Sequence, residues 1–131
     1  LFIAAAFFGK RTGSVVGGVG MALSDLLTGW VPWAPITLIT VGIMGFVYAL
    51  IVDRKPTLVR LIIASVAVLA VKVAGYYIGE TIMYGSFLVP LASIPGNIIQ
   101  IGVNSVIAIP VILMLKATCE NLINKLAPSA R

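Results

Sequence analysis

The feature that most constrains the fold of this chain is the spacing of its charged residues, which gather in short groups between long apolar stretches. Only 10% of the 131 residues are charged and 60% are hydrophobic, and no charge lies between Glu80 and Lys116. A soluble domain is about a quarter charged. Uncharged stretches long enough to cross a bilayer predict transmembrane helices. We therefore expect an all-α membrane protein, with one integral membrane domain over residues 1–131.

Charges and turn residues divide the chain into five apolar blocks, which are residues 1–9, 13–29, 36–52, 57–84 and 96–117. The first block is too short to span, because a spanning helix needs about 20 residues. It is predicted to be the end of a helix that starts before Leu1. Residues 10–12 are predicted to form a tight polar turn. Residues 30–35 and 85–95 are predicted as loops, and residues 118–131 as a polar tail. Pro110 predicts a kink in the last helix.

Basic residues alternate with uncharged segments along the chain, and this pattern predicts the orientation. The basic segments contain Lys10 and Arg11, then Arg54, Lys55 and Arg60, then the tail, whereas the loops at 30–35 and 85–95 carry no charge. Basic loops stay cytoplasmic. We therefore expect a multi-pass protein of the plasma membrane with a cytoplasmic tail at residues 118–131. The same alternation predicts a six-helix bundle in the intact protein, truncated here to four complete spans plus a partial helix.

The composition excludes several kinds of chemistry. Histidine is absent, and the one cysteine is Cys119. Metal sites of His and Cys, catalytic pairs that use them, and intrachain disulfides lack their atoms. We therefore expect neither an enzyme nor a bound cofactor or metal. The isolated bases also do not indicate a nucleic-acid partner.

Polar residues inside predicted membrane helices are costly and mark candidate functional sites. Lys72, Tyr76 and Glu80 share one face of the fourth block through their spacing of four residues. A second polar stripe begins at Ser93, just before the fifth block, and continues along that block with Asn97, Gln100 and Asn104. Thr37 is a further polar side chain, in the third block. Both stripes are expected to face an outward-opening polar cavity, with Trp33 beside it.

Structural explanations stay open for these residues. Lys72 could form a buried ion pair with Glu80 or Asp25, or extend toward the membrane surface. The amide stripe could hydrogen bond between helices, and Trp33 could be an interfacial aromatic residue. The glycines spaced by four residues fit close packing inside the bundle or a docking face for another subunit. These glycines are Gly9, Gly13, Gly17, Gly75 and Gly79.

Several short motifs together resemble one family of membrane proteins. The first half contains GGVG at 17–20, ALSDLLTG at 22–29 and WAPIT at 33–37. The second half contains GYY at 75–77, Glu80, YG at 84–85 and IPGNIIQ at 94–100. In this order they resemble the substrate-binding S components of energy-coupling factor (ECF) vitamin transporters, most closely the riboflavin type. The resemblance covers essentially the whole chain.

The resemblance implies a function, partners and a binding site. S components have six helices, bind a vitamin or vitamin precursor from outside, and join a transmembrane coupling subunit and two cytoplasmic ATPases. In relatives a lysine of the fifth helix and an asparagine at the start of the sixth contact the ligand, and Lys72 and Asn97 match these positions. Together with the polar faces and the tryptophan described above, the predicted site comprises Asn97, Lys72, Tyr76, Gln100, Trp33, Thr37 and Glu80.

Two other functions remain open at the level of sequence. The chain could be a membrane assembly subunit that carries no small molecule. An intramembrane enzyme is the weaker alternative, because one Asp and one Glu inside the spans leave little for acid–base chemistry. The aromatic residues suit a flat heterocycle such as riboflavin, but they do not identify one vitamin.

Overall fold

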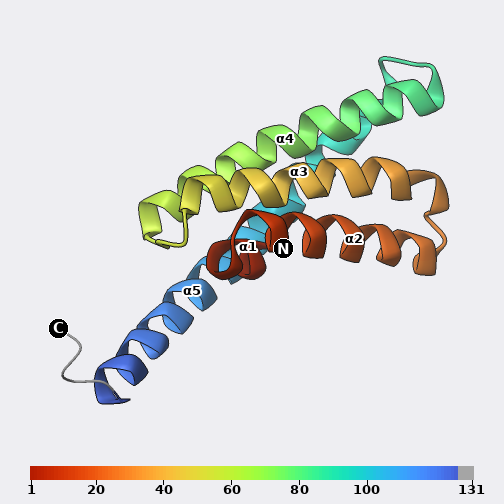
Figure 1. Ribbon diagram of the computed structural model, residues 1–131. Coiled ribbons are helices and arrows are strands. Elements are labelled where there is room, and N and C mark those ends of the chain that lie inside the picture. The colour runs from red at the N-terminus through yellow and green to blue at the C-terminus, as the bar shows by residue number, and fades with distance from the viewer. Residues whose placement is uncertain (127–131) are drawn as a thin grey trace.

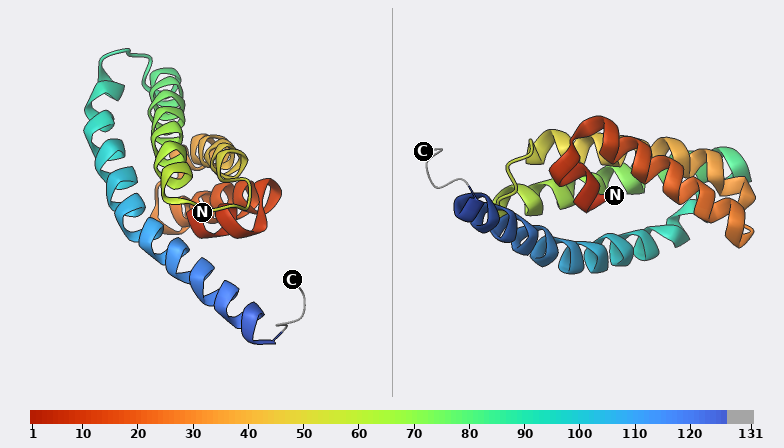
Figure 2. Two further views of the ribbon diagram at one scale, coloured as in Figure 1. Left: turned by 90° about the vertical axis from the view of Figure 1, so that its left-hand side faces the viewer. Right: turned by 60° about the horizontal axis from the view of Figure 1, so that its bottom comes forward.

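The computed structural model of the chain describes residues 1–126, and they form five α-helices and two short 3₁₀ helices. The elements are α1 (Phe2–Phe8), α2 (Lys10–Thr28), η1 (Val31–Trp33), α3 (Ala34–Val52), α4 (Leu58–Tyr84), η2 (Val89–Ser93) and α5 (Ile94–Leu126). The prediction of an all-α protein is therefore confirmed for the described residues. In Figure 1, α2, α3 and α4 lie side by side, and α5 passes behind them. Both views of Figure 2 show α5 as a curved helix, with Pro110 inside it.

Three segments are long and apolar enough to cross a membrane, by length and composition, among the described residues. They are Val31–Val52, Leu58–Tyr84 and Val89–Leu122. The sequence predicted four such spans, and α2 is the difference. It has 19 residues, as α3 does, but it includes Lys10, Arg11 and Asp25. The six-helix bundle and the truncated first helix stay predictions.

The polar turn predicted at residues 10–12 is wrong, because these residues form the first turn of α2. The chain reverses at Gly9 alone, whose φ of 88° lies in a region open to glycine but not to most residues. The short helix α1 therefore packs back along α2. A Cβ at Gly13 would lie 2.6 Å from the Cβ of Ala5, so the close packing of α1 on α2 requires glycine at residue 13.

Two other boundaries differ from the sequence prediction at prolines. Pro35 and Pro95 stand in the first turns of α3 and α5, where a missing backbone N–H costs no helical hydrogen bond. The predicted loops at 30–35 and 85–95 therefore contain 3₁₀ turns and the starts of these helices. At its other end α5 continues past Ala117 to Leu126, so part of the predicted tail is helical. Residues 127–131 of the predicted tail lie outside the described residues.

Glycines set the distance between the helices. At Gly45 a Cβ would collide with the backbone of Gly13, and at Gly18 it would lie 2.8 Å from the carbonyl oxygen of Leu38. Gly75 and Gly79 meet side chains of α3 in the same way. Small residues allow membrane helices to approach closely where the hydrophobic effect does not drive them together. For Gly13, Gly75 and Gly79, packing inside the bundle is therefore the observed use.

The core lies where α1, α3, α4 and α5 meet. Its large fully buried side chains include Tyr48, Leu61, Val68 and Ile112. The ring of Tyr48 stacks on Phe2 with centroids 4.6 Å apart, which fixes α1 against α3. The two connections without charge lie at one end of these helices and the α3–α4 turn lies at the other (Figure 1).

Candidate functional site

The carboxylate of Glu80 joins three segments at the end of the bundle that carries the uncharged connections. Glu80 lies in the last third of α4 and is 7% exposed. One oxygen accepts a hydrogen bond of 3.3 Å from the indole N–H of Trp33, and the other accepts one of 2.7 Å from the hydroxyl of Ser93. Trp33 ends η1 and Ser93 ends η2. One buried carboxylate thus holds both uncharged connections against α4, and we call Glu80, Trp33 and Ser93 the carboxylate clasp.

Aromatic rings and a second polar pair surround the carboxylate clasp. The ring of Trp33 lies 5.1 Å from that of Trp30 and 6.1 Å from that of Tyr84, both in edge-on geometry. One turn further into the bundle, the hydroxyls of Thr37 and Tyr76 are 2.9 Å apart and share a hydrogen bond. Since Thr37 is 1% exposed, this bond satisfies a polar group that has no access to water.

Lys72 lies one turn before Tyr76 and is 4% exposed. Its Nζ atom is 4.6 Å from the centroid of the Tyr76 ring, in cation–π geometry. Neither Asp25 nor Glu80 comes within 4 Å of it, since the one ion pair among the described residues joins Lys116 and Glu120. The buried ion pair that the sequence left open for Lys72 is therefore not formed. An ammonium group without a carboxylate partner is costly to bury and is available to a ligand.

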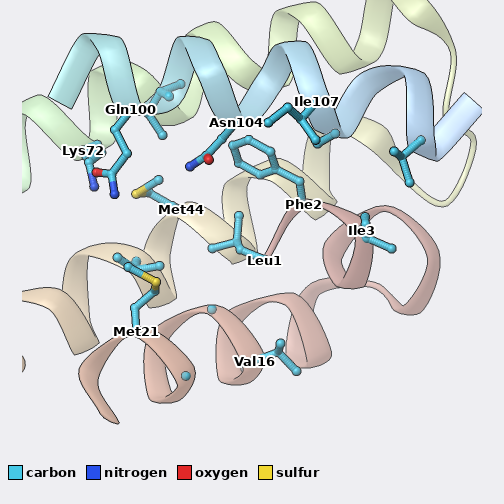
Figure 3. Close-up of a pocket in the computed structure, with 16 residues that line it drawn as sticks. Leu1, Phe2, Ile3, Val16, Met21, Met44, Lys72, Gln100, Asn104 and Ile107 are labelled. Atoms are coloured by element: carbon cyan, nitrogen blue, oxygen red, sulfur yellow. The ribbon is translucent and has the colours of Figure 1, made fainter. Parts of the chain in front are cut away.

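Lys72 lines a cavity of about 480 Å³ that lies between the α1–α2 hairpin and α5. Figure 3 shows Gln100 and Asn104 pointing from α5 into it, opposite Met44, Met21 and Leu1. The remaining wall is apolar. The lining residues are Leu1, Phe2, Ile3, Val16, Gly17, Gly20, Met21, Val41, Met44, Lys72, Gln100, Ile101, Asn104, Ile107, Ala108 and Val111. Such a cavity, mostly apolar with a few convergent polar groups, is typical of a small-molecule site.

Six of the seven predicted site residues fall into two groups, and Asn97 belongs to neither. Lys72 and Gln100 line the cavity. Trp33, Thr37, Tyr76 and Glu80 form the polar and aromatic cluster beside it, joined to the cavity through the contact between Lys72 and Tyr76. Asn97 is half-buried near the start of α5 and does not line the cavity.

The site predicted from the sequence does not include two kinds of residue that line the cavity. Asn104 was part of the polar stripe, so its spacing of four from Gln100 was a usable signal. Met21 and Met44 had none, because a methionine in an apolar helix is indistinguishable from the core or lipid-facing residues around it.

The basic residues gather at the other end of the bundle. The guanidinium of Arg54 donates to the carbonyl of Phe8 at 3.5 Å, and the ammonium of Lys116 donates to that of Pro56 at 3.2 Å. Arg60 donates to the carbonyl of Val52 at 3.2 Å. These contacts bring the α1–α2 reversal, the α3–α4 turn and the C-terminal half of α5 together. We call this region the basic end.

Comparison with families of known proteins matches residues 1–117 to the family described as ECF-type riboflavin transporter, S component. The match covers most of the chain, including every residue that lines the cavity. No curated protein and no solved structure in the comparisons matches the chain.

Proposed function

This chain belongs to the family of S components of ECF-type riboflavin transporters, which are substrate-binding membrane subunits and not enzymes. From that premise we propose that it binds riboflavin, or a vitamin precursor with a similar flat heterocycle, in the cavity between the α1–α2 hairpin and α5. The vitamin is taken up from outside and passed inward when the subunit joins a transmembrane coupling subunit and two cytoplasmic ATPases.

The observation that carries the proposed site is the position of Lys72 in the wall of this cavity. Its buried ammonium has no carboxylate within 4 Å, and two amide side chains, Gln100 and Asn104, line the same space. The volume of about 480 Å³ lies within the range of small-molecule sites, about 300–1,000 Å³.

The polar groups match the edge of a flat heterocycle. An ammonium only donates hydrogen bonds, whereas an amide side chain both donates and accepts. Lys72 therefore suits a carbonyl oxygen, and Gln100 and Asn104 suit alternating ring nitrogens and carbonyls. The apolar wall, including Met21 and Met44, suits the faces of the ring.

The residues beside the cavity have a supporting part in the proposal. We propose that Trp33 and Glu80, as parts of the carboxylate clasp, hold the uncharged connections over the site. Tyr76 and Thr37 position the side chain of Lys72. Asn97 precedes Gln100 by three residues and so lies on the same side of α5. Its contact with the ligand, which the family resemblance implies, requires the ligand to extend from the cavity toward the uncharged connections.

The proposed orientation follows from the distribution of charge. Every Lys and Arg of residues 1–126 other than Lys72 and Lys125 lies in or next to the reversals and the α5 segment that meet at the basic end. Because basic loops stay cytoplasmic, we assign the basic end and the C-terminus to the cytoplasm. The carboxylate clasp then faces the outside, from which the vitamin arrives.

A binding titration tests this function. Riboflavin fluorescence is followed on the purified, detergent-solubilised protein, with the amount of folded protein measured separately. Asn104→Ala should weaken binding about 5- to 150-fold, which corresponds to the 1–3 kcal/mol lost when a hydrogen-bond partner of the enclosed ligand is removed. Asn121→Ala, at a position of the same helix that does not line the cavity, is the matched control and should bind normally.

Two results would contradict the proposal. If Asn104→Ala and Lys72→Met both bound riboflavin as the unchanged protein does, the cavity would not be the site. If the unchanged protein retained no vitamin or precursor on purification and bound none in titration, a membrane assembly subunit without cargo would be the better description.

A further inference from the structure

A second cavity, of about 460 Å³, lies at the basic end and shares no lining residue with the proposed vitamin site. It is lined by the α1–α2 reversal, the first turn of α2 and the end of α3. Three basic side chains contribute to its wall and one acidic side chain does. The lining residues are Phe8, Gly9, Lys10, Arg11, Thr12, Ala49, Asp53 and Arg54.

The positive charge of this cavity is not neutralised within the described part of the chain. Asp53 forms no ion pair within 4 Å with Lys10, Arg11 or Arg54. The ammonium of Lys10 lies 5.8 Å from the centroid of the Phe46 ring, a contact that leaves its charge uncompensated. Arg54 donates one of its N–H groups to the carbonyl of Phe8, and its other N–H groups remain available to a ligand. Three bases against one acid leave an excess of positive charge around one concave surface.

The backbone around the cavity adds to this charge. The first turn of α2 contains no acidic residue, and no side chain caps its N-terminus. The amide groups at a helix N-terminus lack helical partners and carry the positive end of the helix dipole. At the opposite wall, Asp53 and Arg54 both have positive φ, at 50° and 54°. These two left-handed residues turn the chain so that the Arg54 side chain reaches Gly9.

We propose that the basic-end cavity binds a phosphate group, held by Lys10, Arg11 and Arg54. Phosphate diesters and monoesters accept hydrogen bonds from guanidinium and ammonium groups, and basic pockets between membrane helices bind the headgroups of anionic lipids. A lipid headgroup and a soluble phosphate share this chemistry. Because the cavity opens where the helices end at the basic end, an anionic phospholipid is the source that the location favours.

A thermal-stability titration of the purified, detergent-solubilised protein tests the site. Short-chain phosphatidylglycerol should raise the melting temperature in a saturable way, and phosphatidylcholine, whose headgroup has no net charge, should not. Lys10→Gln and Arg11→Gln should each weaken the apparent affinity about fivefold, the effect expected for one basic side chain at an anionic surface. Neither side chain donates a hydrogen bond to another described residue, so both variants should fold.

Lys55→Gln is the matched control, because it removes one positive charge from the same turn as Arg54 but does not line the cavity. It should leave the affinity for phosphatidylglycerol unchanged. An equal loss in Lys55→Gln would mean that only the general charge of the basic end is sensed, and the site would be refuted. Absence of any saturable effect of phosphatidylglycerol and of inorganic phosphate would refute it as well.

Inorganic phosphate at matched concentration separates the two sources. If phosphate alone reproduces the stabilisation, and Lys10→Gln weakens it, the site is real and its ligand is a soluble phosphate. If Lys10→Gln and Arg11→Gln reduced only assembly with a coupling subunit, and no phosphate effect existed, the surface would dock a protein and the proposal would fail. Riboflavin binding should be unchanged in all three variants, so this result and the test of the vitamin site are independent.

Discussion

Replacing Gly45 with alanine tests whether backbone contact between α2 and α3 sets the shape of the bundle. The added Cβ would collide with the carbonyl group of Gly13 and would lie 2.8 Å from the amide nitrogen of Ser14. All of these are backbone atoms, so no side-chain rotation relieves the contact. α2 would have to move as a unit.

The expected loss of stability follows from two opposing effects. Overpacking of a well-packed core costs about 1–3 kcal/mol. Exchange of an interior helical glycine for alanine returns up to about 1 kcal/mol. After the full gain is subtracted, the net effect is a destabilisation of up to about 2 kcal/mol relative to the unchanged protein, and of about 1–3 kcal/mol relative to a glycine-to-alanine exchange without a clash. Because α2 and α3 both line the vitamin cavity, through Gly17 and Val41 among others, a displaced α2 should also weaken ligand binding.

Gly102→Ala is the matched control. Gly102 lies inside α5, and a Cβ there would have no neighbour within 4 Å. This variant should be as stable as the unchanged protein or more stable, by at most about 1 kcal/mol. Unfolding by titration with a denaturing detergent, followed by circular dichroism, compares the three proteins. If Gly45→Ala were as stable as Gly102→Ala, close packing at Gly13 and Gly45 would not hold these helices together.

Three further predictions concern single contacts and the orientation. Ser14→Ala removes the hydrogen bond of 2.8 Å from the Ser14 hydroxyl to the carbonyl of Gly42. In the same unfolding assay the free energy of unfolding should fall by about 0.6 kcal/mol, the average for interhelical hydrogen bonds in membranes. A decrease above about 2 kcal/mol would point to a different role for Ser14. Trp33→Phe keeps an aromatic side chain but removes the indole N–H that donates to Glu80, so vitamin dissociation should be faster in a stopped-flow experiment. Trp30→Phe makes the same exchange at an indole that forms no hydrogen bond with another described residue, and it should not change the dissociation rate. In a Cys119→Ser background, Lys55→Cys should react with a membrane-impermeant thiol reagent only from inside and Phe87→Cys only from outside; the reverse pattern would invert the assigned orientation.

The glycines illustrate which part of the helix packing can be predicted from the sequence and which part cannot. Their spacing of four residues indicated a close-packed face, and the structure confirms this for Gly13, Gly75 and Gly79. The same spacing could not tell which helix each one meets. Gly45, which is not part of either spaced series, makes the closest approach, because its partner Gly13 is defined only when α2 and α3 are docked.

The sequence alone determined the all-helical membrane character, most of the helix positions and the gathering of positive charge between helices, because hydrophobic length, proline and charge act locally. It also determined that Lys72, Tyr76 and Glu80 share a face. Tertiary structure decided that Glu80 accepts from Trp33 and Ser93, while Lys72 lies without a carboxylate partner in a cavity wall with Gln100 and Asn104. These outcomes depend on the rotation of each helix about its axis and on the register between helices. Both are fixed by contacts between residues far apart in the chain, which no local pattern specifies.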